Sequence, residues 1–168
     1  DSDESRGLGD VYKRQSIETG ISYFSKGEVI ENQRRILQSV LIDSEIKDQF
    51  NIELTMPSAY SLFKKEEDFL WYQKPTKYGT SNVVISELNS LDEMSLRGVI
   101  ETRDSISKRY IPGRLENSYM ITEQAYEPFF IQTKIKQFDS SETRGTWEVV
   151  GDFMGGPFIN YIIKDTLN

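Results

Sequence analysis

Hydrophobic and polar positions along residues 26–50 repeat at three- and four-residue intervals, which is the period of an amphipathic helix. The apolar positions form one stripe: Val29, Ile30, Ile36, Leu37, Val40, Leu41 and Ile46. Charged and polar residues occupy the remaining positions. We expect a helix that restarts near Asp43 and Ser44, where a cap can form. The stripe favours core packing over a partner-binding face.

Alternating or β-prone stretches follow and predict short strands. They lie at residues 52–56, 60–65, 69–74, 82–88, 118–122, 129–138, 145–150 and 158–163. We expect the strands at 69–74 and 82–88 to pair as a hairpin. A polar turn is predicted at 139–142, and a glycine-rich connection at 151–157.

A second helix is predicted between these groups of strands. Ser90 stands three residues before Glu93, the spacing of a capping box, and a helical period then continues to Tyr110. Pro112 and Gly113 end it. The element order predicts an α+β fold: a largely antiparallel sheet of about seven strands with two amphipathic helices packed on one face.

Composition excludes several kinds of chemistry. The 168 residues include 27 Asp and Glu against 20 Lys and Arg, a formal charge of −7, which argues against nucleic-acid binding. No apolar run approaches the roughly 18 residues of a membrane-spanning helix. His and Cys are absent, which excludes a Ser-His-Asp triad, a thiolate nucleophile and a His- or Cys-ligated metal within the chain. We expect no cofactor and no metal.

The two ends of the chain differ from its middle. Residues 1–15 resemble a translated adapter at the edge of a metagenomic gene fragment, the alternative being a native flexible N-terminus. Residues 16–168 are then expected to form a single α+β domain that is truncated at both ends.

The densest polar cluster surrounds Trp147. Glu142, Arg144 and Glu148 share one face of a strand, and Asp152 follows. Two carboxylates can perform acid–base chemistry if their environments push their pKa values apart. An arginine between two acids instead keeps both ionised, so the pattern favours a structural ion-pair ladder over a catalytic dyad.

Other candidates each have a structural alternative. Gly155 and Gly156 could form an anion-binding nest, but a tight turn or bulge that needs positive φ is favoured. Trp147 could join an aromatic platform for a glycan or peptide with Trp71, Tyr72 and Tyr119, although such residues are more often core. Arg103 and Asp104 lie late in the second helix, where an arginine suits the macrodipole. A calcium site at Asp139 and Glu142 lacks EF-hand spacing. The predicted binding residues are Arg103, Asp104, Arg144, Trp147, Glu148, Asp152, Gly155 and Gly156.

Several short motifs occur in a distinctive order. They are the segments 56–60 (MPSAY), 69–71 (FLW), 103–105 (RDS), 110–113 (YIPG), 118–123 (SYMITE), 142–148 (ETRGTWE) and 154–158 (MGGPF). In this order the chain resembles an uncharacterised domain-of-unknown-function family of predicted Bacteroidetes cell-envelope lipoproteins. The resemblance covers about residues 25–168 and is densest from 103 to 158.

The resemblance implies an envelope location, with an upstream lipid anchor as the only membrane attachment. It brings no catalytic residues, because the family has no established activity. We therefore expect a non-enzymatic binding or structural module whose partner is an envelope protein or glycan. The alternative is a carboxylate-dependent hydrolase that acts on envelope glycans.

Overall fold

The computed structural model describes residues 26–88 and 94–164, and the chain divides into two compact units, 1–85 and 86–168. One unit contains a three-stranded sheet and the other a four-stranded sheet. The predicted α+β class with antiparallel strands is confirmed, although the strands are divided between two sheets. The predicted leader at 1–15 lies outside the described residues, and a single domain from residue 16 stays a prediction.

The described part of the first unit starts with two helical segments, residues 26–38 and α2 (Glu45–Phe50). The predicted restart is confirmed, because the Asp43 carboxylate accepts the backbone N–H of Glu45 at 2.8 Å. Asn51 ends α2 in the left-handed conformation, with φ 53°.

The prediction that the whole apolar stripe is core is wrong for residues 26–38. Val29, Ile30 and Leu37 are exposed, whereas Ile46 on α2 is buried. The break at 39–44 interrupts the helical period, so the earlier positions no longer share a face with Ile46.

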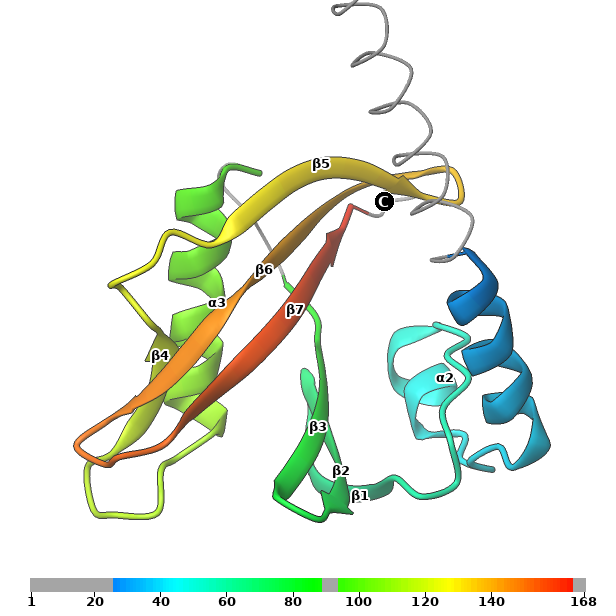
Figure 1. The fold of residues 1–168 in the computed structure, drawn as a ribbon, viewed down its shortest axis with the longest axis horizontal. Coiled ribbons are helices and arrows are strands. Elements are labelled where there is room, and N and C mark those ends of the chain that lie inside the picture. Colours follow the sequence, from blue (N-terminus) through cyan, green and yellow to red (C-terminus); the bar gives the residue numbers. More distant parts are fainter. Residues whose placement is uncertain (1–25, 89–93, 165–168) are drawn as a thin grey trace, which may run out of the picture. The chain divides into compact units, whose positions relative to one another are not determined.

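Strands β1 (Ser61–Glu66), β2 (Phe69–Thr76) and β3 (Gly79–Ser86) form the first sheet in that order, as Figure 1 shows. Its core contains Leu70 and Tyr72 of β2 with Ile46 and Met56. The Tyr72 hydroxyl donates to Asp43 at 2.9 Å, which ties β2 to the start of α2. Burial, and then this contact, raise the pKa of Tyr72.

The strand predicted at 52–56 is wrong. This segment is irregular, and only an isolated bridge joins Pro57 to Val40. Met56 is buried whereas Ile52 and Leu54 are exposed, so the alternating apolar residues do not share one buried face. Among residues 26–88 and 94–164, no strand runs beside the segment to complete a ladder.

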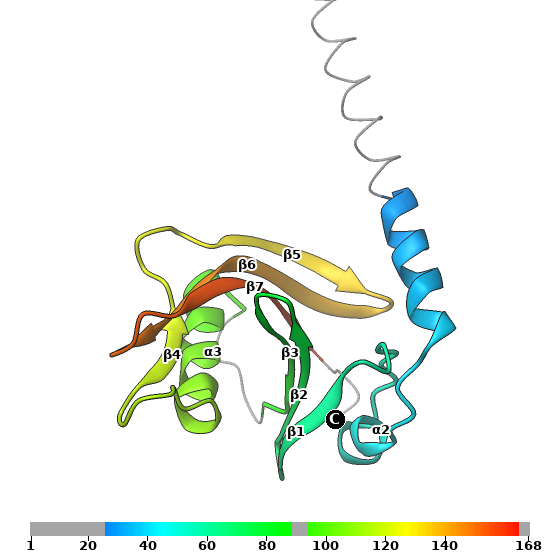
Figure 2. The same ribbon diagram turned by 60° about the horizontal axis from the view of Figure 1, so that its bottom comes forward.

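The second unit contains α3 (Leu96–Tyr110), β4 (Tyr119–Thr122), β5 (Phe129–Ile135), β6 (Phe138–Val150) and β7 (Gly155–Ile163). Figure 2 shows the long strands β5, β6 and β7 side by side. The helix is capped by Ser95, whose Oγ accepts the backbone N–H of Gly98 at 3.2 Å. The predicted cap Ser90 lies outside the described residues.

Strand β6 is the centre of this sheet. Along one edge it pairs with β5 and then with β4, and along the other with β7. The turn predicted at 139–142 is wrong, because these residues lie within β6. The chain turns instead just before β6, where Lys136 adopts a φ of 55°, so that Ile135 and Phe138 pair. Ser140, Ser141 and Thr143 are fully buried between the flanking strands.

We expect Leu70→Ala to lower the free energy of unfolding by about 2–5 kcal/mol, because Leu70 is wholly buried in the core of the first unit. Leu54→Ala, the same change at an exposed site, should cost roughly 0.5 kcal/mol or less. Urea unfolding followed by Trp fluorescence measures both. Equal losses for the two variants would contradict this description of the core.

Candidate functional site

The residues predicted to bind all lie in the second unit, but they do not converge on one site. They fall on four elements: Arg103 and Asp104 on α3, Arg144, Trp147 and Glu148 on β6, Asp152 in the β6–β7 turn, and Gly155 and Gly156 on β7. Contacts divide them into four separate arrangements.

Arg103 and Asp104 join α3 to the sheet. Asp104 Oδ1 accepts the backbone N–H of Thr122 at 2.8 Å and its hydroxyl at 2.7 Å, and Arg103 Nη1 lies 3.1 Å from the same oxygen. The Arg103 guanidinium also lies over the Phe158 ring, 4.0 Å from its centroid. Burial lowers the pKa of Arg103, and Asp104 opposes that shift. These groups satisfy one another, so the arrangement is architectural.

Glu142 and Arg144 form an ion pair on the sheet face that points away from α3. Glu142 is only 8% exposed and accepts a hydrogen bond from the Tyr161 hydroxyl of β7 at 2.8 Å. That hydrogen bond and then Arg144 lower the pKa of Glu142, against the effect of burial. Burial and then Glu142 raise the pKa of Tyr161.

The carboxylates around Trp147 do not form an acid–base pair. A general acid must keep its proton near neutral pH, whereas the lowered pKa of Glu142 keeps that group ionised. Glu148 is exposed on the same face and has no ion pair among the described residues. Asp152 faces Arg114 instead. Of the series of ion pairs that the strand pattern favoured, the pair between Glu142 and Arg144 is present.

Trp147 packs against the two glycines at the start of β7. A Cβ at Gly155 would lie 2.8 Å from the backbone oxygen of Trp147, and one at Gly156 would lie 3.1 Å from its indole ring. The expectation that these glycines supply positive φ is wrong, because in this hairpin only Gly151 does so, with φ 84°. Gly155 and Gly156 are required by the close approach of Trp147.

Asp152 fixes the turn between β6 and β7. Its side chain is only 7% exposed, and it accepts two N–H groups of Arg114 at 3.1 and 3.2 Å. It also accepts the backbone N–H of Phe153 at 2.8 Å. Arg114 lies in the loop between α3 and β4, so this bidentate pair joins two loops and orders both.

The ordered turn presents Phe153 fully exposed to solvent. Met154, the next residue, and Leu115, the neighbour of Arg114, are exposed as well. We call these three residues, Leu115, Phe153 and Met154, the apolar turn surface. Exposed large apolar side chains on loops that an ion pair joins are candidates for an interaction site.

Sequence reasoning missed Arg114 and Phe153. Arg114 lies 38 residues before Asp152, so no local pattern links the two. The only available signal for Phe153 was an aromatic residue inside a glycine-rich connection, where polar residues are usual. The macrodipole explanation for Arg103 also fails, because this residue lies in the middle of α3 and binds β4.

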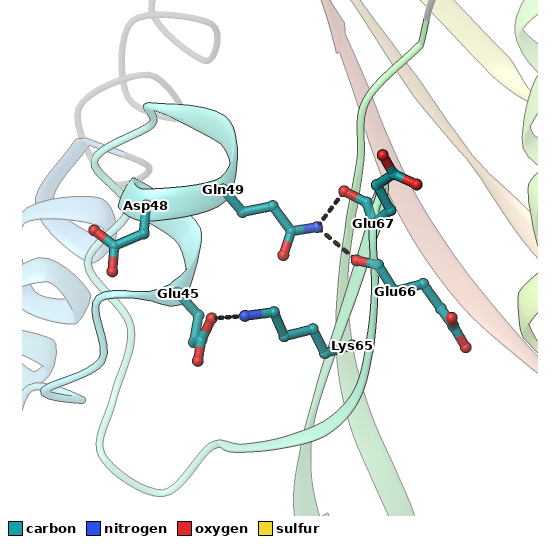
Figure 3. A pocket seen from close by; sticks show the side chains of 6 residues that line it. All are labelled: Glu45, Asp48, Gln49, Lys65, Glu66 and Glu67. Carbon is teal, nitrogen blue, oxygen red and sulfur yellow. Dashed lines mark hydrogen bonds and ion pairs between the residues drawn. The ribbon is translucent and has the colours of Figure 1, made fainter.

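A separate, open pocket lies in the first unit, and Figure 3 shows its lining. Gln49 on α2 donates to the backbone oxygens of Glu66 and Glu67 at 2.7 and 2.8 Å, and Lys65 pairs with Glu45. These contacts join α2 to the β1–β2 turn. Within residues 26–88 and 94–164, no group of three or more acidic residues is placed to bind a metal.

Comparisons with known proteins give one result. Residues 39–168 match the family described as Domain of unknown function (DUF4837). No curated protein and no solved structure matches the chain. No helix within the described part of the chain is long and apolar enough to cross a membrane.

We expect Glu142→Gln to destabilise the protein most near neutral pH. The pKa of Glu142 is lowered below its ordinary value of 4.5 in the folded state, so its stabilising contribution is present above pH 4.5 and is lost as pH falls below it. Urea unfolding at several pH values should show the difference from wild type shrinking in acid. Glu148→Gln, an equal charge change on the same face, should show little difference at any pH. A pH-independent effect of Glu142→Gln would contradict the assignment.

Proposed function

Since the chain belongs to the DUF4837 family, whose function is unknown, we propose a role from the geometry of its own residues. It is a non-enzymatic binding module of the cell envelope that docks on a partner protein through the apolar turn surface. The observation that carries this proposal is the fully exposed Phe153 on a turn ordered by Asp152 and Arg114.

Rigidity makes Phe153 suitable as an anchor. Binding costs free energy whenever it orders a flexible loop, and a turn that is already ordered avoids most of that cost. Aromatic side chains at the centre of an interface often supply most of the binding energy. The partner should therefore offer an apolar pocket that accepts an aromatic ring.

The positive charge of Arg114 beside the turn indicates which groups should line the rim of the partner's pocket. The Arg114 side chain is 71% exposed although it pairs with Asp152, so its outer edge is free to contact a partner. Carbonyl or carboxylate oxygens at the rim of the pocket would bind this edge.

A protein partner is favoured over a glycan. Glycan sites usually present the face of an aromatic ring, and Trp147 was the candidate for that role. The Trp147 indole is packed against Gly156, and the register places these residues directly opposite one another. Phe153 lies at the tip of a protruding turn, which suits a pocket better than a flat sugar ring.

The envelope location and the lipid anchor rest on the motif order described above. The resemblance to predicted Bacteroidetes lipoproteins supports attachment through an acylated cysteine encoded upstream of this chain. Such an anchor would keep the module beside its partner and raise their effective concentration.

We expect Phe153→Ala to weaken partner capture by about tenfold or more while leaving the fold intact, because the side chain has no intramolecular burial to lose. A photo-crosslinking phenylalanine analogue at position 153 of the full-length protein, irradiated in envelopes of its source cell, identifies the partner. The purified partner then allows affinities to be measured by calorimetry.

Phe129, an exposed phenylalanine on β5, provides the matched control position. The analogue at 129 should give no adduct with that partner, and Phe129→Ala should leave the affinity unchanged. Equal adducts from positions 153 and 129, or an unchanged affinity for Phe153→Ala, would contradict docking through the apolar turn surface.

The location is tested separately by growing the source cell with an alkyne-tagged palmitate. We expect the full-length gene product to incorporate the label and to fractionate with the envelope. An unlabelled product in the cytoplasmic fraction would overturn the lipoprotein assignment without affecting the binding surface.

A further inference from the structure

Strand β7 forms one edge of the second sheet, and its sequence is unusual for an edge. Among the described residues it pairs only with β6, so its other side presents unpaired backbone groups. Its nine residues carry no charge. Natural proteins usually protect such edges with charged residues, as β5 does on the opposite edge with Lys134. The uncharged edge of β7 is therefore suited to strand pairing.

Two backbone hydrogen bonds at the ends of β7 fix which of its backbone groups face outward. Lys164 donates its N–H to Asp139, and the Met154 oxygen accepts from Val149, so even-numbered residues direct their backbone groups toward β6. Successive residues of a strand alternate in direction. The N–H and C=O groups of Ile159, Tyr161 and Ile163 consequently face away from the sheet. Pro157 also faces outward, so its missing N–H costs no bond to β6.

We propose that β7 pairs antiparallel with β7 of a second copy of this chain, about a two-fold axis at Asn160. This arrangement places Ile159 opposite the partner copy's Tyr161, and both residues direct their backbone groups across the axis. These two residues form two backbone N–H···O=C hydrogen bonds with each other. The two-fold axis generates a second, identical pair, so four hydrogen bonds join the two strands. The two sheets become one continuous sheet.

Side chains favour a second copy as the occupant. Ile159 meets Tyr161 on one face, and Phe158 meets Ile162 on the other, so that each contact is an aromatic–aliphatic pair and symmetry repeats both. Such cross-strand pairs stabilise antiparallel sheets. The axis brings no like charges together, because Lys164 falls opposite Gly156.

The residue on the axis adds an independent observation. The side-chain nitrogen of Asn160 is buried and has no hydrogen-bond partner among the described residues. Atoms of its own chain cover this nitrogen, so it becomes available to a second copy only when the side chain turns toward the open edge. In the proposed register Asn160 lies directly opposite its own copy, whose side-chain oxygen can then accept this N–H. A buried amide left unpaired is costly, so the pairing stabilises the dimer.

Asn160→Cys tests the register, because the chain contains no cysteine and the new thiol is the only one. The position is a non-hydrogen-bonded pair, where opposed side chains approach most closely. Under mild oxidation of the purified 168-residue chain, we expect covalent dimer to form about tenfold faster than with the control Gln132→Cys on exposed β5. Equal rates for the two variants would overturn the register.

Ile159→Lys tests the outer edge of β7 at an exposed position, unlike the half-buried Asn160. Sedimentation velocity should show wild-type chain in a concentration-dependent dimer, and Ile159→Lys should weaken that dimer by about tenfold or more. Ile131→Lys, which adds the same charge on β5 and the same face, should dimerise like wild type. A wild-type chain that stays monomeric, or that forms open-ended oligomers, would overturn the proposal. Both tests are independent of Phe153 and of its partner.

Discussion

The second unit depends on one requirement, that every buried backbone group of β6 find a hydrogen-bond partner. This long strand meets it by pairing on both edges, with β5 and β4 in succession on one and with β7 on the other. Both of its edges are paired along residues 140–144, where β5 lies on one side and β7 on the other. As a result, β7 lies at the edge of the sheet with one side unpaired, and a turn joins it to β6. The proposed partner surface and the proposed dimer edge both lie on this hairpin.

The residues that the sequence indicated as candidate site residues stabilise the architecture of the second unit. Arg103 and Asp104 fix α3 to β4, and the close contact of Trp147 with Gly155 and Gly156 sets the start of β7. Asp152 is tied to Arg114 and to the backbone of the turn. Asp104 and Asp152 each pair with an arginine. The features that carry the two proposals are the exposed apolar turn surface and the unpaired edge of β7.

Local pattern predicted most of the elements, because a helical or alternating period depends on neighbours in sequence. It placed β2, β4 and β7 and the restart of the helix near Asp43. The local pattern failed where secondary structure depends on contacts with residues far away in the sequence. The sequence of segment 52–56 alternates, but no strand in the described part of the chain pairs with it. The polar residues at 139–142 have the composition of a turn, yet they form a strand because β5 and β7 pair on either side. The division into two sheets and the pairing of Arg114 with Asp152 also depend on contacts far apart in sequence.

Amide hydrogen exchange along β7, resolved by residue with NMR, tests this description of the hairpin most directly. Amides of Phe158, Asn160 and Ile162 face β6 and should be protected at every protein concentration. Amides of Ile159, Tyr161 and Ile163 should exchange rapidly in dilute solution and become protected as the concentration rises. Protection of both sets in dilute solution would show that the outer edge is already occupied within one chain, and would contradict an edge open to a second copy.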